Sequence, residues 1–204
     1  MALAVRLPRP TPKLAPLNFF VDYLPALARA LRPTWPVVPE PLEVEIVLDG
    51  KDTFTLGLTA RGLASRAGPG SAPLARARLS TSAWRTLALD LLPRVLRLFD
   101  ERLAKAGRDD ANPLALPRPA SAADLLAASG TVEVGYVDDA GERIEVNVSI
   151  ADGQGPRAHL DVTDAELWRL LEGESSLAAA IARLKVKGDA GYLIRLATLL
   201  TKPA

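Results

Sequence analysis

The sequence contains no cysteine and only one histidine, His159. Without cysteine there is no disulfide, no thiolate nucleophile and no cysteine-ligated zinc or iron–sulfur centre. A histidine-based metal site or a histidine-activated nucleophile would depend on this one imidazole, and neither an HExxH nor a GxSxG motif accompanies it. We therefore expect no catalytic residue, no metal and no cofactor, and predict that the protein is not an enzyme.

An excess of either charge is also lacking, because 25 Lys and Arg oppose 24 Asp and Glu. A chain with a net charge of +1 has no field that would attract nucleic acid, so we expect no nucleic-acid partner. About 18 consecutive apolar residues, which a membrane span needs, occur nowhere, and the apolar run in residues 1–5 is too short for a signal peptide. These features predict a cytoplasmic protein.

Proline is concentrated near the N-terminus, where 9 of the 17 prolines fall in residues 8–41. Such a density prevents long regular structure, so residues 1–17 are predicted to form an extended arm. Apolar residues then recur at helical spacing, which predicts a helix over residues 18–32 with a kink at Pro25.

Residues 42–48 and 53–60 alternate between apolar and polar side chains, and Asp49-Gly50 lies between them. This pattern is typical of a β-hairpin. We predict a glycine-rich loop over residues 62–71, a third strand over 74–79, and then a long amphipathic helix kinked at Pro93. Residues 108–120, rich in proline, are predicted to be a linker.

After this linker the same order of elements begins again. A short helix near 121–128 is followed by alternating strands at 131–137 and 142–150, a glycine-containing loop and a third strand at 157–162. The apolar pattern of residues 75–80 recurs in residues 158–163. The sequence thus predicts an internal repeat in which both sets of strands have the same order and facing.

The second unit continues further than the first. Thr163 and Glu166 have the spacing of a capping box, in which the hydroxyl accepts a backbone N–H and the carboxylate reaches back. They are expected to begin a helix. A helix at 175–182, a strand at 184–188 and a helix at 190–201 should then complete the unit.

Residues 184–196, with the sequence LKVKGDAGYLIRL, form a predicted strand that ends in Gly-Asp and leads into an apolar helix. Together with the preceding helix, which carries Trp168 and ends at Gly173, they resemble the C-terminal half of the sterol carrier protein type two family. The resemblance covers residues 121–203, and it extends to residues 42–107 only through the shared order of strands.

This resemblance implies an α+β fold with an antiparallel twisted sheet and helices on one face, here partially duplicated in tandem as a pseudo-dimer. The predicted units are a first unit at 18–107 and a second at 121–204. In the family, an apolar tunnel between sheet and helices holds sterols, acyl chains, phospholipids or isoprenoid tails. The expected function is therefore non-catalytic binding and carriage of a hydrophobic molecule.

Nine residues of the second unit are the candidates for lining such a tunnel, because they come from the helices and the strand that would enclose a ligand. They are Leu167, Trp168, Leu171, Ile181, Leu184, Val186, Leu193, Ile194 and Leu196. The alternative is an accessory module whose tunnel is filled by its own side chains and whose apolar helices dock a partner protein.

One stretch has a bias in charge, because no acidic residue occurs between Asp52 and Asp90 although five arginines do. Arg76, Arg78 and Arg85 are the candidates for contact with a phosphorylated head group, a membrane surface or an acidic partner. The alternative is that they are ordinary solvated arginines. His159 shares a strand face with charged neighbours and is expected to be a partly solvated surface residue.

Overall fold

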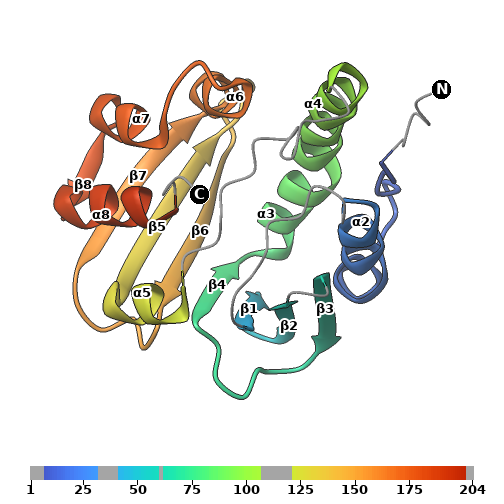
Figure 1. Cartoon of the computed structure of the whole chain (residues 1–204), viewed down its shortest axis with the longest axis horizontal. Helices are drawn as coiled ribbons and strands as arrows, with labels where there is room; N and C mark the ends of the chain where they lie inside the picture. Colours follow the sequence, from blue (N-terminus) through green and yellow to red (C-terminus); the bar gives the residue numbers. More distant parts are fainter. Residues whose placement is uncertain (1–6, 32–40, 60–61, 107–120, 201–204) are drawn as a thin grey trace.

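The structure, a computed structural model, describes residues 7–31, 41–59, 62–106 and 121–200 (Figure 1). Its eight strands form one mixed, unclosed sheet in the order β3-β2-β1-β4-β6-β5-β7-β8. The expected α+β class is confirmed. The predicted linker at 108–120 lies outside the described residues.

The strands and helices lie close to the ranges predicted from the sequence, with one additional strand. The strands are β1 Leu42–Leu48, β2 Asp52–Thr59, β3 Gly62–Ala67, β4 Ala75–Leu79, β5 Gly130–Val137, β6 Arg143–Ile150, β7 Arg157–Thr163 and β8 Val186–Gly188. The helical segments are α1 Pro16–Asn18, η1 Phe19–Tyr23, α2 Leu24–Ala30, α3 Thr81–Arg85, η3 Thr86–Leu91, α4 Leu92–Lys105, α5 Ala122–Ala127, α6 Asp164–Glu172, α7 Leu177–Arg183 and α8 Ala190–Leu200.

Two features of the sheet differ from the prediction. Pairs β1–β4 and β5–β7 are parallel, so the expectation of an antiparallel sheet is wrong for these pairs. β3 lies at the outer edge of β2, so β4 pairs with β1. In the second half, β4 lies at the outer edge of β6, so β7 pairs with β5. Residues 62–67, predicted to be part of a loop, form β3, an edge strand of mostly small side chains held by its backbone pairing with β2.

The two sets of strands share one arrangement. β2-β1-β4 and β6-β5-β7 have the same order and the same relative directions. The sets are joined where β4 pairs antiparallel with β6, with Ala77 opposite Val148. One continuous sheet therefore crosses the whole molecule.

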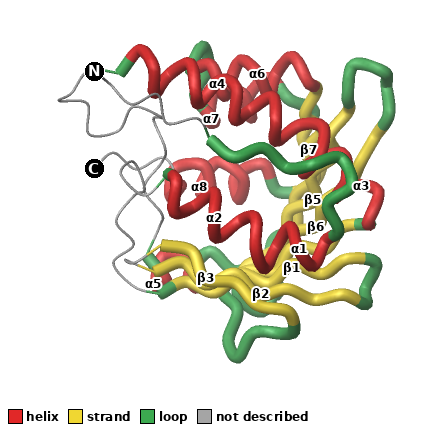
Figure 2. The backbone as a smooth tube through the Cα atoms, turned by 90° about the vertical axis from the view of Figure 1, so that its right-hand side faces the viewer, coloured by secondary structure: helices red, strands yellow, loops and turns green. Residues whose placement is uncertain are grey.

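The register of the strands places their apolar side chains on one face. Ile46, Ala77, Val148 and Val132 are successive partners across four strands, and partners in register point to the same side. The helices pack on this side, as expected, and Figure 2 shows α2, α4, α6, α7 and α8 along the same side of the bent sheet. The opposite face carries the polar residues of the alternating strands.

The two prolines predicted to kink helices each follow a π-helical turn. α1, η1 and α2 form one continuous helix, as do α3, η3 and α4. Pro25 and Pro93 have no N–H for the usual bond to the carbonyl four residues earlier. The preceding residues bond five residues back, Leu24 to Phe19 and Leu92 to Leu87, so the helix widens without breaking.

Several helices begin at a serine or threonine cap. Thr163 Oγ1 accepts the backbone N–H of Glu166 at 3.3 Å, as the sequence predicts, and Ser80 accepts that of Ala83 at 3.0 Å. The reciprocal half of the capping box is absent at Thr163. The Glu166 carboxylate pairs with Arg183 of α7 and Arg169 of its own helix.

The described part of the N-terminal arm lies against the helices. Leu7 is buried, and its N–H donates to Asp100 of α4 at 3.0 Å. The hydroxyl of Tyr23 donates to the carbonyl of Pro8 at 2.9 Å. Burial raises the pKa of Tyr23 to about 12, although the charge of Arg9 acts in the opposite direction.

Candidate functional site

The buried apolar side chains form two separate clusters. In the N-terminal core, aromatic rings of the first helix pack on the sheet, with the centroids of Phe20 and Phe54 4.5 Å apart. The C-terminal core lies between α8, α7 and strands β5 to β7. The buried members of the N-terminal core are Leu7, Phe19, Phe20, Tyr23, Leu27, Leu31, Leu48, Phe54, Trp84, Ala88 and Leu96. Those of the C-terminal core are Val132, Ile150, Ala158, Leu160, Val162, Ile181, Tyr192, Leu193, Leu196 and Ala197.

Between these cores lies a set of apolar residues that belongs to neither. Val44, Ala75, Ala77 and Val146, here called the central floor, come from the three neighbouring strands β1, β4 and β6. All four are only half-buried. A sheet of this kind normally buries its apolar face against helices, and the middle strands are the farthest from any edge. The central floor is therefore apolar surface that the two cores leave partly open.

Helices from the two halves meet beyond one end of this floor. Arg94 of α4 donates to both carboxylate oxygens of Asp164, the first residue of α6, at 3.1 and 2.9 Å. Arg102, two turns further along α4, donates to the carbonyl of Leu171 near the end of α6. The two helices therefore lie side by side and bridge the N-terminal and C-terminal halves.

Asp164 is the most heavily bonded group in this bridge. Its side chain is 6% exposed, and Tyr136 of β5 donates a third hydrogen bond to it at 2.5 Å. Burial acts to raise the pKa of Asp164, but the hydrogen bonds from Arg94 and Tyr136 and the charge of Arg94 lower it overall. The nearby indole of Trp168 acts in the same direction, although its N–H has no hydrogen-bond partner of good geometry.

The predicted lining residues fall into two groups. Most of them lie together at the C-terminal core, and three lie elsewhere. Ile181, Leu193 and Leu196 are buried in that core, and Leu167, Leu184 and Val186 pack against it. Trp168 and Leu171 lie half-buried on α6, with the Arg94 guanidinium 4.6 Å from the centroid of the Trp168 ring. Ile194 is 49% exposed.

The three arginines predicted to contact an anion do not form one cluster. Arg76 pairs with Glu45, a buried carboxylate on the polar face of the sheet that also accepts the backbone N–H of Gly70 at 3.1 Å. Arg78 lies on the same face, 3.4 Å from the hydroxyl of Ser149. Arg85 is exposed on α3, in the helical layer.

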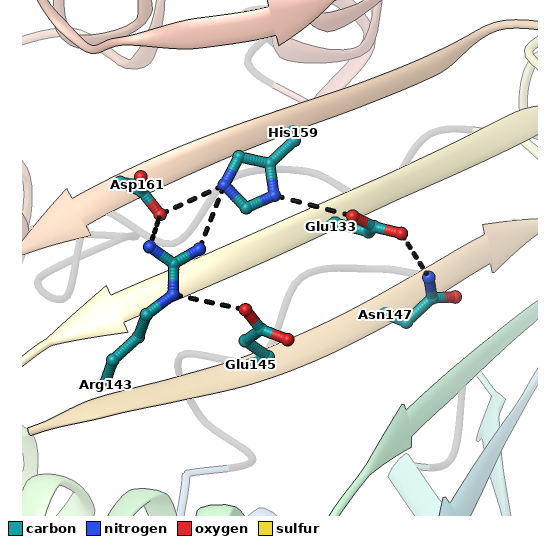
Figure 3. Close-up of polar contacts among 6 residues, drawn as sticks. All are labelled: Glu133, Arg143, Glu145, Asn147, His159 and Asp161. Atoms are coloured by element: carbon teal, nitrogen blue, oxygen red, sulfur yellow. Dashed lines mark hydrogen bonds and ion pairs between the residues drawn. The ribbon is translucent and has the colours of Figure 1, made fainter.

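The polar face also carries a charged network that the sequence did not predict (Figure 3). His159 of β7 lies at its centre, with Nδ1 3.5 Å from Glu133 Oε2 and Nε2 3.1 Å from Asp161 Oδ1. Arg143 of β6 reaches the same Nε2 at 3.1 Å and pairs with Asp161 at 2.8 Å. Glu145 accepts from the other side of that guanidinium at 3.2 Å. His159 has 16% of its side chain exposed and is therefore partly solvated, as expected.

A glycine makes this network possible. Gly135 lies on β5, between the strands of Arg143 and Asp161, and a Cβ there would be 2.3 Å from Asp161 Oδ1 and 2.9 Å from Arg143 Nη2. The two side chains meet across the glycine. Partial burial acts to raise the pKa of Asp161, but its hydrogen bond and charge contact with Arg143 lower it overall. Gly135 is the one residue in the sequence that could have indicated this network. It does so only when the register of β5 with β6 and β7 is known.

Three cavities bordered by described residues lie on this polar face, away from the predicted lining residues. One of about 200 Å³ is bordered by residues of β5, β7 and β8, including His159, Arg157 and Lys187. Two others, of about 350 and 410 Å³, lie where β4 and β6 join. Within the described ranges, no three His, Asp or Glu side chains are grouped to hold a metal ion. No helix in those ranges has both the length and the hydropathy to cross a bilayer.

No protein-family model matches the chain, and no curated protein matches it. The resemblance of residues 121–203 to the sterol carrier protein type two family therefore stays a prediction from sequence.

Proposed function

We propose that the protein binds a long apolar molecule on the central floor, between the N-terminal and C-terminal cores, and carries it without chemical change. The observation that supports this most is the partial exposure of Val44, Ala75, Ala77 and Val146 in the middle of the sheet.

The shape of the floor favours a narrow, extended ligand. Ala75 and Ala77 have the smallest side chains of the floor, so we expect the most room for a ligand above β4. Valines of β1 and β6 border it on both sides. The contact of α4 with α6 bridges the helical layer beyond one end of the floor.

The chemistry of the floor favours binding alone. Its side chains are hydrocarbon and offer no proton donor, acceptor or nucleophile. Each methylene removed from water contributes about 0.8 kcal/mol, so a chain of about a dozen gives roughly 10 kcal/mol before the costs of association. An acyl chain, a sterol or an isoprenoid tail has this character.

The relation between the two halves supports the same proposal. We infer from the matching order and directions of β2-β1-β4 and β6-β5-β7 that the chain is a partial tandem duplication of one unit, related to the sterol carrier protein type two family. In this view the ligand lies between the two units, and the C-terminal core, with Leu193 and Leu196, forms one wall of its site.

Native mass spectrometry of the purified protein, followed by solvent extraction, tests the proposal. We expect adducts with the mass of a lipid and the recovery of that lipid in the extract. Delipidated protein should then take up a fluorescent fatty acid. If the purified protein carries no lipid and the delipidated protein takes up no fatty acid or sterol, the carrier function is wrong.

A second candidate function is an accessory module that docks a partner protein. It is favoured by two large apolar side chains, Leu126 of α5 and Ile194 of α8, which are 54% and 49% exposed. α5 and α8 are neighbours, because the Tyr192 hydroxyl donates to the carbonyl of Ala128 at 3.0 Å. If lipid is absent, and if replacing both side chains by serine abolishes the capture of a specific partner, this function replaces the first.

A further inference from the structure

We propose that the cavity bordered by β5, β7 and β8 is a second binding site, which takes a small oxyanion such as phosphate or a phosphate monoester. We call it the anion pocket. It lies on the polar face of the sheet, opposite the face that carries the central floor, so it is independent of the carrier function. Its lining residues are Thr131, Glu133, Arg157, Ala158, His159, Lys187 and Gly188.

The register of three strands brings the charged groups together. His159 lies between its partners Glu133 on β5 and Lys187 on β8, and Arg157 lies two residues before it on the same face of β7. The cavity has a volume of about 200 Å³. Pockets for drug-sized ligands hold about 300 to 1,000 Å³, so the anion pocket fits a single tetrahedral group and not a large molecule.

The cations of this pocket are available for a ligand. Arg157 and Lys187 are exposed, and in the described part of the chain neither has a carboxylate partner. Arg94, Arg143 and Arg183, in contrast, are all paired. Two unpaired cations that border one cavity are an arrangement that an anion would stabilise.

Glu133 is the one carboxylate among the lining residues, and it is already engaged. His159 Nδ1 lies 3.5 Å from one of its oxygens, and Asn147 donates to the other at 3.4 Å. Its negative charge places the bound anion toward Arg157 and Lys187. There the planar guanidinium donates two parallel N–H groups to a phosphate, and the ammonium supplies a point charge.

Gly188 allows β8 to pair closely with β7. Its φ is +84°, and a Cβ on it would lie 2.3 Å from the carbonyl oxygen of Arg157. No other residue allows the backbone of β8 to approach Arg157 so closely. This pairing places Lys187 opposite His159, on the face of the sheet that also carries Arg157.

Calorimetric titration of the folded protein with inorganic phosphate tests the site. Arg157→Gln and Lys187→Gln should each weaken phosphate binding by about tenfold, because each removes one charge-assisted contact. Arg97→Gln on α4 and Lys185→Gln just before β8 are the matched controls, since both residues are exposed and neither lines the pocket. Both controls should bind phosphate as the unsubstituted protein does.

A second experiment distinguishes a lipid head group from a soluble phosphate as the source of the anion. It measures binding of the protein to phosphatidylcholine vesicles that contain phosphatidic acid. If the protein binds the vesicles and inorganic phosphate displaces it, the phosphate belongs to a lipid head group. If phosphate binds and the vesicles do not, the ligand is soluble. An unsubstituted protein that binds neither phosphate nor the vesicles overturns the proposal, as does phosphate binding that is equal in all four variants. Lipid carriage on the opposite face is measured separately, so either proposal can fail alone.

Discussion

The guanidinium of Arg94 and the carboxylate of Asp164 are 70 residues apart in the sequence and form a two-contact pair, with N–O distances of 3.1 and 2.9 Å. Arg94 belongs to a helix that packs on the N-terminal core, and Asp164 begins a helix of the C-terminal half. The Asp164 side chain is 6% exposed and has lost most of its hydration, so its hydrogen-bond partners must replace the water. This pair therefore couples the helices of the two halves in addition to the β4–β6 contact.

Arg94→Met should lower the free energy of unfolding by about 2 kcal/mol, because it leaves a buried carboxylate with only part of its hydrogen bonds. Urea denaturation followed by circular dichroism measures the loss. Arg97→Met, one turn along the same exposed side of α4, is the control and should change stability little. Equal losses in both variants would mean that the pair contributes nothing specific.

Asp164 should also make stability depend on pH in the acid range. Burial acts to raise its pKa, but Arg94 and Tyr136 lower it overall, below its value in the unfolded chain. A carboxylate of this kind contributes stability above its unfolded pKa of about 3.9, and this contribution is lost as pH falls toward the folded pKa. Urea unfolding at several pH values between about 3 and 6 should show a shallower decline for Asp164→Asn than for the unsubstituted protein. An identical dependence in both proteins would contradict this account.

Gly135→Ala should disrupt the network around His159. The added methyl group would lie 2.3 Å from Asp161 Oδ1, so Asp161 and Arg143 must separate. We expect a loss of no more than about 1 kcal/mol in thermal denaturation, because the displaced atoms are side-chain ends on the polar face, and changed NMR chemical shifts of the His159 ring. Gly57→Ala on β2 is the control. Its added Cβ would lie 3.8 Å from the nearest atom, the carbonyl oxygen of Ala64, so the substitution should be tolerated. Unchanged chemical shifts of the His159 ring in Gly135→Ala would show that the glycine is not needed.

The elements that the sequence predicted well depend on local pattern. Asp49-Gly50 between two alternating runs identifies the first hairpin, and the hydroxyl of Thr163 identifies the start of α6. β3 was missed because its small side chains carry no apolar alternation, and its pairing with β2 is made by backbone groups. The parallel pairs β1–β4 and β5–β7 were missed because the third strand of each set could pair with either strand of its hairpin. Which of the two it joins depends on the other strands of the sheet, and the sequence of the hairpin does not show it.

The candidate sites depend on register, which the sequence does not display. Ala75 and Ala77 are ordinary strand residues in sequence, and their partial exposure follows from where the helices of the two halves lie. The partners of His159 were not predicted, because Arg143 and Glu133 come from other strands, 16 and 26 residues earlier. Arg76, a candidate for contact with an anion, pairs with the buried Glu45, a contact that becomes visible only in the register of β1 and β4.

The predicted anionic contact is best tested on the two other arginines. Reversal of Arg76 would leave Glu45 buried without its partner and would confuse binding with stability. Arg78→Glu combined with Arg85→Glu should weaken binding to acidic vesicles or an acidic partner, and the effect should shrink as salt is raised. Co-sedimentation at low salt measures it. Unchanged binding at low salt would make both residues ordinary solvated arginines.

The final prediction separates an open central floor from a filled one by placing the same large side chain at two positions. Leu196 is 6% exposed in the C-terminal core, so Leu196→Trp should overpack it and cost about 1 to 3 kcal/mol of unfolding free energy. Ala77 lies on the half-buried floor. If a ligand normally occupies the space above it, Ala77→Trp should leave stability nearly unchanged while the uptake of a fluorescent fatty acid falls. Urea denaturation and fatty-acid titration on both variants give the two measurements. A stability loss in Ala77→Trp as large as that in Leu196→Trp, together with no lipid uptake by the unsubstituted protein, would mean that the floor is filled by the chain itself, and the accessory-module function would then replace the carrier.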